Sequence, residues 1–207
     1  PALAVTATID AGRVEGGRVE YGYDYSADLR RFFGDDLVVE YDVDVSDVPE
    51  AILVIPCIAN LAPVAWATGA DLAVPKLDGR FVDALAHVRR GFERVYPEFV
   101  AGSASGKAER GEVRVGECVD DPEVKDGEDD DADPAILFSG GVDSLASYVT
   151  HREADPYLVT IHGFDITLDD REAWAKRAPE LRAFGEARGL KNRFVRMNVH
   201  SALNVFL

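Results

Sequence analysis

The residues best suited to chemistry form one short run, Ser139-Gly140-Gly141-Val142-Asp143-Ser144. The apolar residues 136–138 before it are typical of a buried strand, and a helix can begin directly after the second glycine. The glycines allow a sharp turn and a close approach of the backbone to a ligand. Free N–H groups at the helix start, the helix dipole and the two serine hydroxyls all favour an anion. The run therefore predicts a phosphate-binding turn.

Three familiar motifs do not fit this turn. A Walker loop needs Lys followed by Ser or Thr after its last glycine, but Gly141 is followed by Val142 and Asp143. A dinucleotide fingerprint needs three spaced glycines, and a hydrolase elbow needs a glycine on both sides of its serine. Asp143 would repel bound phosphates unless a cation lay between them. It therefore predicts a magnesium ion with Asp143 as its protein ligand.

The run resembles the Ser-Gly-Gly-x-Asp-Ser signature of the PP-loop ATP pyrophosphatases, the adenine nucleotide alpha hydrolase-like superfamily. That resemblance implies ATP and Mg²⁺ as cofactors, with residues 139–144 as the ATP site and with Ser139 and Asp143 as catalytic residues. Within the superfamily the run is most similar to 7-cyano-7-deazaguanine synthase and its relatives. That synthase has a late cysteine zinc site and begins close to its PP-loop, two features that this chain does not show.

A second part of the site is expected at the end of the next strand, residues 157–162. In the PP-loop enzymes the matching strand end binds adenine through backbone groups, which implies Thr160, Ile161 and His162, with Phe164 against the ring. His162 could also be a base, a metal ligand or, more commonly at a strand end, a structural residue. Asp165, Asp169 and Asp170 are candidates for further magnesium ligands, although Asp169 and Asp170 more simply cap the next helix.

The elements that must position these residues predict an α/β fold. Helices are expected at 145–153 and 170–188, and a third strand at 193–199. Strand–helix alternation of this spacing is typical of a parallel, doubly wound, Rossmann-like sheet, which binds ligands at the carboxyl ends of its strands. This nucleotide domain is expected to span residues 135–207 and to be incomplete at its C-terminus, because three strands are few for such a sheet.

A smaller α+β domain is expected to precede it at residues 1–100. The apolar run 51–68 predicts a buried, kinked or broken helix rather than a membrane span, because it contains two prolines. Hydrophobicity collapses over residues 101–134, which predicts an acidic linker or mobile loop. The remaining predictions for this half are strands at 3–9, 17–25 and 37–44, and helices at 27–33 and 79–96.

The composition is strongly acidic, with 38 Asp and Glu against 22 Lys and Arg in 207 residues and a formal net charge of −16. This excess of acid with little lysine resembles proteins of halophilic archaea, in which salt screens the repulsion. This negative charge disfavours the binding of nucleic acid through a general basic surface. The exception is a local cluster, Arg89, Arg90 and Arg94, which more commonly forms a solvated face. The lone Cys57 and Cys118 suit a reducing, cytoplasmic location without a membrane anchor.

Together these features predict an enzyme that cleaves ATP to AMP and pyrophosphate. It would adenylate a small-molecule carboxylate or carbonyl before attack by ammonia or another nucleophile. Two alternatives stay open, a tRNA-modifying thiolase with the same adenylate chemistry and a non-catalytic adenine-nucleotide-binding module. The expected partner is therefore a small-molecule acceptor, tRNA is less favoured, and the sequence leaves a homo-oligomer open.

Overall fold

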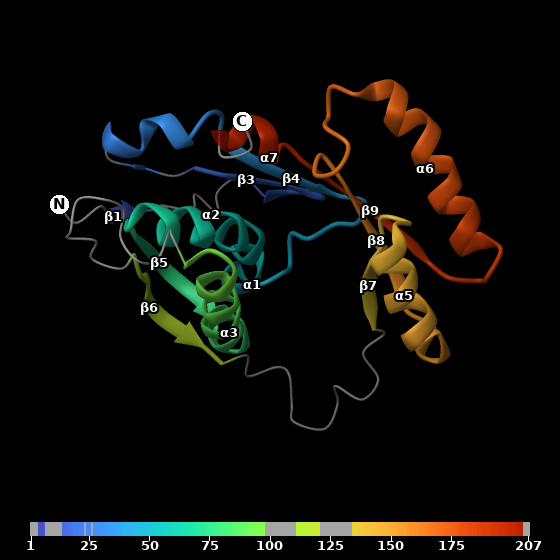
Figure 1. Cartoon of the computed structure of the whole chain (residues 1–207), viewed down its shortest axis with the longest axis horizontal. Coiled ribbons are helices and arrows are strands. Elements are labelled where there is room, and N and C mark those ends of the chain that lie inside the picture. The colour runs from blue at the N-terminus through green and yellow to red at the C-terminus, as the bar shows by residue number, and fades with distance from the viewer. Residues whose placement is uncertain are drawn as a thin grey trace.

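The computed structural model describes residues 4–6, 14–22, 24–25, 27–97, 111–120 and 134–204. This part of the chain is a mixed α/β structure with two sheets and helices packed on both (Figure 1). The α/β class expected from the sequence is confirmed at this level.

The larger sheet has six strands in the order β2-β3-β4-β9-β8-β7. Neighbouring strands are parallel from β7 to β9 and antiparallel from β9 through β4 to β2. The strands are β2 (Val14–Glu15), β3 (Arg18–Tyr21), β4 (Leu37–Tyr41), β7 (Ala135–Leu137), β8 (Tyr157–His162) and β9 (Asn192–Met197). The predicted parallel order thus holds for β7 to β9, but strands from the first part of the chain extend the same sheet.

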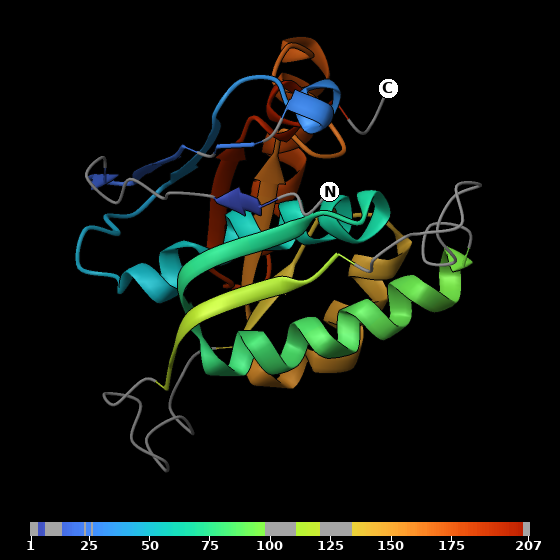
Figure 2. The same ribbon diagram turned by 90° about the vertical axis from the view of Figure 1, so that its left-hand side faces the viewer.

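The smaller sheet is parallel, in the order β1-β5-β6, with β1 (Ala4–Thr6), β5 (Asp71–Asp78) and β6 (Val113–Val119). Figure 2 shows β5 and β6 side by side, with α3 (Gly79–Val95) across one face. The prediction of a linker is wrong for residues 113–119, because the alternating Val113 and Val115 give this acidic stretch an apolar face against the core. Residues 101–110 and 121–133 lie outside the described residues. Strand β5 was not predicted.

Helices α1 (Glu50–Leu53) and α2 (Ile55–Thr68) lie between the two sheets (Figures 1 and 2). They are separated at Val54, which confirms the prediction of a broken helix. The other helical elements are η2 (Ala27–Phe32), α5 (Val142–His151), η4 (Arg152–Ala154), α6 (Arg171–Glu186) and α7 (Val199–Ala202). Among the described residues, none of the helices combines the length and the apolar character that a membrane crossing requires.

The main hydrophobic core is one cluster that joins α2 to both sheets, and a second, smaller core lies under α5 and α6. Cys57 is buried in the main core, where burial raises the pKa of its thiol to about 12. The second core is built on Phe138, Leu158 and Leu181, which fix the end of β7 and the middle of α6. On α3, Arg89 Nε contacts Glu93 Oε1 at 3.1 Å, as expected of a solvated face with local pairs.

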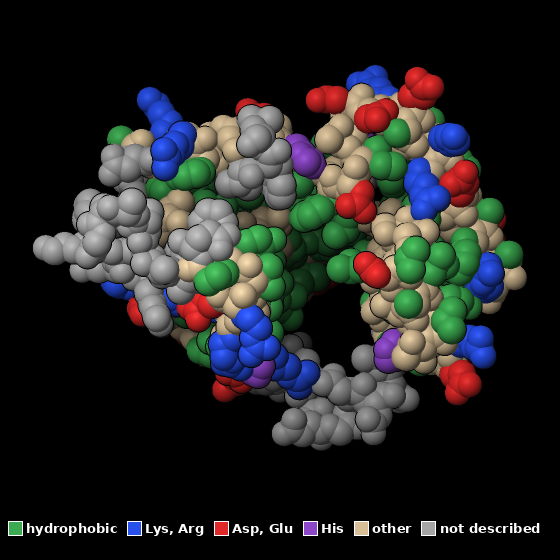
Figure 3. All heavy atoms as spheres, viewed as in Figure 1, with side chains coloured by type: hydrophobic (Ala, Val, Ile, Leu, Met, Phe, Trp, Pro, Cys, Tyr) green, Lys and Arg blue, Asp and Glu red, His purple; other side chains and the backbone are tan. Residues whose placement is uncertain are grey.

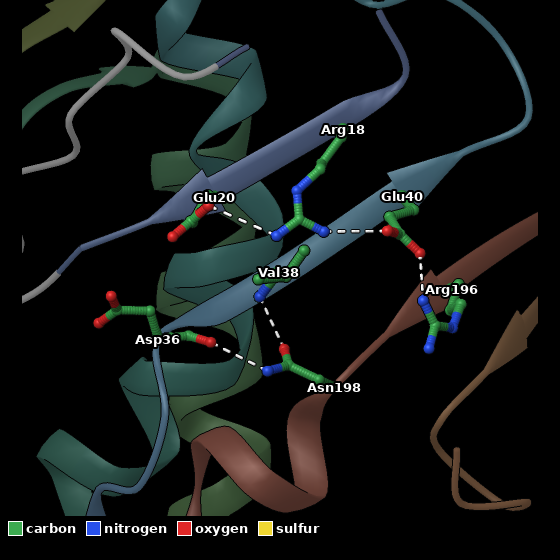
Figure 4. A network of polar contacts seen from close by, with 7 residues as sticks. All are labelled: Arg18, Glu20, Asp36, Val38, Glu40, Arg196 and Asn198. Carbon is green, nitrogen blue, oxygen red and sulfur yellow. Dashed lines mark hydrogen bonds and ion pairs between the residues drawn. The ribbon is translucent and has the colours of Figure 1, made fainter. Parts of the chain in front are cut away.

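A polar network ties β3 and β4 to β9 across the outer face of the larger sheet (Figure 4). Glu40 accepts a hydrogen bond from Arg196 at 2.6 Å and another from Arg18 at 2.9 Å. These bonds lower the pKa of the Glu40 carboxyl below its ordinary value, and the bond from Arg196 has the larger effect. The Asn198 Oδ1 atom accepts from the Val38 N–H at 2.7 Å. The early hairpin and the late strand are therefore held together by side chains as well as by the strand ladder.

Candidate functional site

The Ser139-Gly140-Gly141 turn lies at the carboxyl end of β7 and is fixed to β8 by two hydrogen bonds. The Phe138 N–H donates to the Val159 carbonyl oxygen at 2.7 Å, and the buried Thr160 hydroxyl donates to the Phe138 carbonyl oxygen at 2.7 Å. Phe138 itself fills the second core. The backbone therefore leaves the sheet at a fixed point, immediately before Ser139.

Gly140 has φ of +71°, a conformation that side-chain-bearing residues seldom adopt. A Cβ atom here would lie 2.6 Å from Arg177 Nη2 and 2.9 Å from Leu181 Cδ2. The positive φ therefore favours glycine here, and the ends of the Arg177 and Leu181 side chains occupy the space that a Cβ atom would take.

The N-terminus of α5 has no side-chain cap, because its N-cap residue is Gly141. The first hydrogen bond of the helix is donated by the Leu145 N–H to the Gly141 carbonyl oxygen, at 3.0 Å. The N–H groups of Val142, Asp143 and Ser144 thus have no acceptor within the helix. The Ser144 hydroxyl donates to Gly141 O at 3.0 Å. This helix start offers an anion several donors and the positive end of a dipole.

Asp143 is exposed in the first turn of α5 and has no hydrogen-bond or ion-pair partner among the described residues. Both of its carboxylate oxygens are therefore available to a hard cation such as Mg²⁺. No group of three or more His, Cys, Asp or Glu side chains in the described ranges could hold a metal ion by itself. A magnesium ion here would depend on phosphate oxygens for its other ligands, as is usual for Mg²⁺ at nucleotide sites.

The end of β8 presents backbone groups beside the turn. Val159 accepts from Phe138 on the β7 side, so Ile161, two residues further on, directs its N–H and C=O to that same edge. Strand β7 ends at Leu137. The Ile161 backbone groups therefore point past the end of β7, where a ring with donors and acceptors could bind them. The Thr160 side chain is occupied by its bond to Phe138.

The His162 ring stacks on Trp174 of α6, with ring centroids 3.9 Å apart and planes 2° apart. Burial is the main cause that lowers the pKa of His162 below its ordinary value, so the ring is neutral at pH 7. Its Nε2 atom has no hydrogen-bond partner within the described part of the chain. Of the alternatives that the sequence left open, this stack favours a structural side chain over a general base.

The turn after β8 contains the other candidate residues. Phe164 is 42% exposed, and its carbonyl oxygen accepts from His200 Nε2 at 2.8 Å. Asp165 is exposed at the same strand end. Asp170 is the N-cap of α6 and accepts from the Ala173 N–H at 3.0 Å, whereas Asp169 accepts from the Arg171 N–H through its backbone carbonyl oxygen, at 2.9 Å. Asp170 is therefore a helix cap, and Asp165 is the acid that remains beside the site.

Two cavities meet at the strand ends and share Ser139, Thr160, Ile161 and Asp165. The larger, about 560 Å³, lies between α2 and the sheet, and Figure 3 shows hydrophobic side chains in the hollow between these parts of the molecule. Its other lining residues are Val39, Tyr41, Pro56, Ala59, Asn60, Leu137, Phe138, Val159, Phe164, Val195 and Met197. The smaller, about 280 Å³, lies against α6 and is also lined by Gly141, Ile166, Trp174, Arg177 and Leu181.

The sequence did not identify Arg177 or Trp174 as site residues. The signal was present, because Trp174, Arg177 and the buried Leu181 follow one another at three- and four-residue spacing and therefore share one face of α6. What the sequence could not show is that this face meets the turn at Ser139.

Comparison with protein-family models, with curated proteins and with solved structures finds no match to this chain.

Proposed function

We propose that this protein is a PP-loop ATP pyrophosphatase, which cleaves ATP to AMP and pyrophosphate as it adenylates a small-molecule carboxylate or carbonyl. The observation that carries the proposal is the glycine turn at the end of β7, with its uncapped helix and, in the first helical turn, an Asp143 that has no partner among the described residues. Strands β7 to β9 with α5 and α6 would then be the nucleotide-binding half of a doubly wound sheet. Residues 1–100 would add an α+β domain to it.

The phosphates of ATP would bind the N–H groups of residues 142–144, since the Gly141 N–H already donates to Ser139 Oγ at 3.4 Å. The adenine ring would lie against Phe164 and hydrogen-bond the backbone of residues 160–162, because the Ile161 groups point past the end of β7. The apolar cavity beneath α2 adjoins the same turn and would receive the acceptor. This placement brings the three reacting parts to one strand end, which is the main way such a site accelerates a reaction.

In the proposed reaction an acceptor oxygen attacks the α-phosphorus, and the bond to the oxygen that bridges to the β-phosphorus breaks. Pyrophosphate leaves with that electron pair, and the donors of the turn stabilise its charge. Asp143 with phosphate oxygens would hold magnesium, which when bound supplies further charge neutralisation. Ammonia or another nucleophile then attacks the adenylated carbon, and AMP leaves. The acidic composition supports a salt-rich cytoplasm as the setting.

A second candidate is a non-catalytic module that binds ATP. One observation favours it: the His162 ring is stacked on Trp174 and its Nε2 atom is buried, so this nitrogen does not face a substrate as a general base would.

The test is product analysis with ATP labelled at the α-phosphate, with magnesium and a protein-free extract of small molecules as the source of acceptors. We expect labelled AMP, and at least about a 100-fold lower rate for Asp143→Asn, since a metal contact contributes several kcal/mol to the transition state. The melting temperature of the variant should stay close to that of the wild type. ADP as the sole product would contradict the proposal, and bound ATP without any product would favour the module.

A further inference from the structure

Arg177 on α6 contacts the turn directly. Its Nη2 atom donates to the Ser139 carbonyl oxygen at 2.8 Å, and its Nη1 atom donates to Glu180 Oε2 at 2.9 Å. The side chain is 36% exposed, so part of the guanidinium faces solvent. A guanidinium has five N–H donors in a planar fork. These two contacts leave the remaining donors for a ligand in the smaller cavity.

The charge balance of the two cavities differs. Among the described residues that line either cavity, Arg177 is the sole cation, and it belongs to the smaller one. Asp165 lines both cavities and carries the opposite charge. Among these lining residues, Arg177 is therefore the side chain that can offset the charge of a polyphosphate bound beside Asp165.

The absence of a side chain at Gly140 makes room for this arginine. A Cβ atom at that position would lie 2.6 Å from Arg177 Nη2, inside van der Waals contact. The bond to Ser139 O also satisfies a carbonyl oxygen of the turn, whose partial negative charge would otherwise repel phosphates. The guanidinium thus positions the turn and adds positive charge on the side where the turn has no lysine.

We propose that Arg177 is the pyrophosphate-binding and turn-positioning residue of this site. The β- and γ-phosphates of the nucleotide then occupy the smaller cavity against α6, and the larger apolar cavity is left to uncharged groups. This inference rests on the proposed function, because it assumes that the turn binds a nucleotide.

The test is calorimetric titration of the protein with inorganic pyrophosphate and magnesium, and in parallel with adenosine. Arg177→Gln should weaken pyrophosphate binding about 10- to 100-fold, since hydrogen bonds to charged groups contribute that much. Arg177→Lys keeps the charge without the fork and should recover part of the affinity. Adenosine binding should not change in either variant, an outcome that mere loss of structure would not give.

Arg171→Gln is the matched control, because it removes the same charge from the first turn of the same helix without touching the turn at Ser139. It should bind pyrophosphate within about twofold of the wild type if the effect is local rather than a long-range charge effect. If Arg177→Gln binds pyrophosphate with wild-type affinity, this inference is overturned but the proposed function is not. If Arg177→Gln does not fold, wild-type affinity in Arg177→Lys with adenosine binding intact would overturn the role of the fork. A wild-type protein that binds neither ATP nor pyrophosphate would overturn the proposed function itself.

Discussion

Two strand-to-helix turns stand side by side in the larger sheet, and they end differently. The turn from β7 to α5 and the turn from β8 to α6 both contain a glycine with positive φ, Gly140 at +71° and Gly163 at +109°. The second turn then closes with Asp170, whose carboxylate accepts from the Ala173 N–H. The first turn ends on Gly141, and no side chain caps α5.

The open start of α5 fits the proposed anion site, although α1, α2 and α7 also begin without a side-chain cap. An aspartate cap typically stabilises a helix by about 1 kcal/mol, and both α3 and α6 have one. An uncapped start at the end of a strand, beside a cavity with Ser139 and Arg177, keeps its donors available to an external anion.

The largest effect is expected at Gly163. A Cβ atom here would overlap the backbone carbonyl oxygen of Met197, which is held in β9 and cannot rotate away. Gly163→Ala should therefore lower the free energy of unfolding by about 3 kcal/mol or more. Urea denaturation monitored by Trp fluorescence measures this change. A loss below about 1 kcal/mol would show that the second turn is not rigid.

Gly140→Ala should destabilise the fold less than Gly163→Ala does, and its main effect should be weaker binding of pyrophosphate. Its positive φ costs about 1 to 2 kcal/mol for alanine, while the nearest atom, Arg177 Nη2, is the end of a flexible side chain and can move. That movement breaks the bond to Ser139 O, so pyrophosphate affinity should fall by at least about 10-fold. Denaturation and calorimetry on the same preparation separate the two effects. Unchanged affinity would mean that the Arg177 contact has no part in binding.

The smallest and most specific effects come from exchanging the caps. Gly141 has an ordinary φ of −78°, and a Cβ atom would meet only Ser139 Oγ at 3.4 Å, so Gly141→Asn is sterically allowed. A new cap should raise the free energy of unfolding by a few tenths of a kcal/mol and weaken pyrophosphate binding, because it occupies donors of the turn. Thermal melting and calorimetry test both.

The converse change, Asp170→Ala, should cost about 1 kcal/mol and leave pyrophosphate binding unaltered. If Gly141→Asn binds pyrophosphate as well as the wild type does, the open start of α5 is not the anion site.

The sequence determined the parts of this protein that depend on neighbouring residues. The glycines of the first turn, the break before α2 and the ends of β8 and α6 follow from turn chemistry, proline and hydrophobic period, all of which act within a few positions. It also brought Ser139, Asp143 and the end of β8 to one edge, because parallel strands share their carboxyl ends. Their ligands stay predictions.

Only the tertiary structure decided which distant segments meet. Arg177 reaches Ser139 across 38 positions, and Glu40 joins Arg196 across 156. The pairing of β4 with β9, and of β6 with β5 inside an apparently acidic linker, depends in the same way on register and packing. Such contacts are set by how whole elements bury their apolar faces together, and a local pattern of residues does not contain that information.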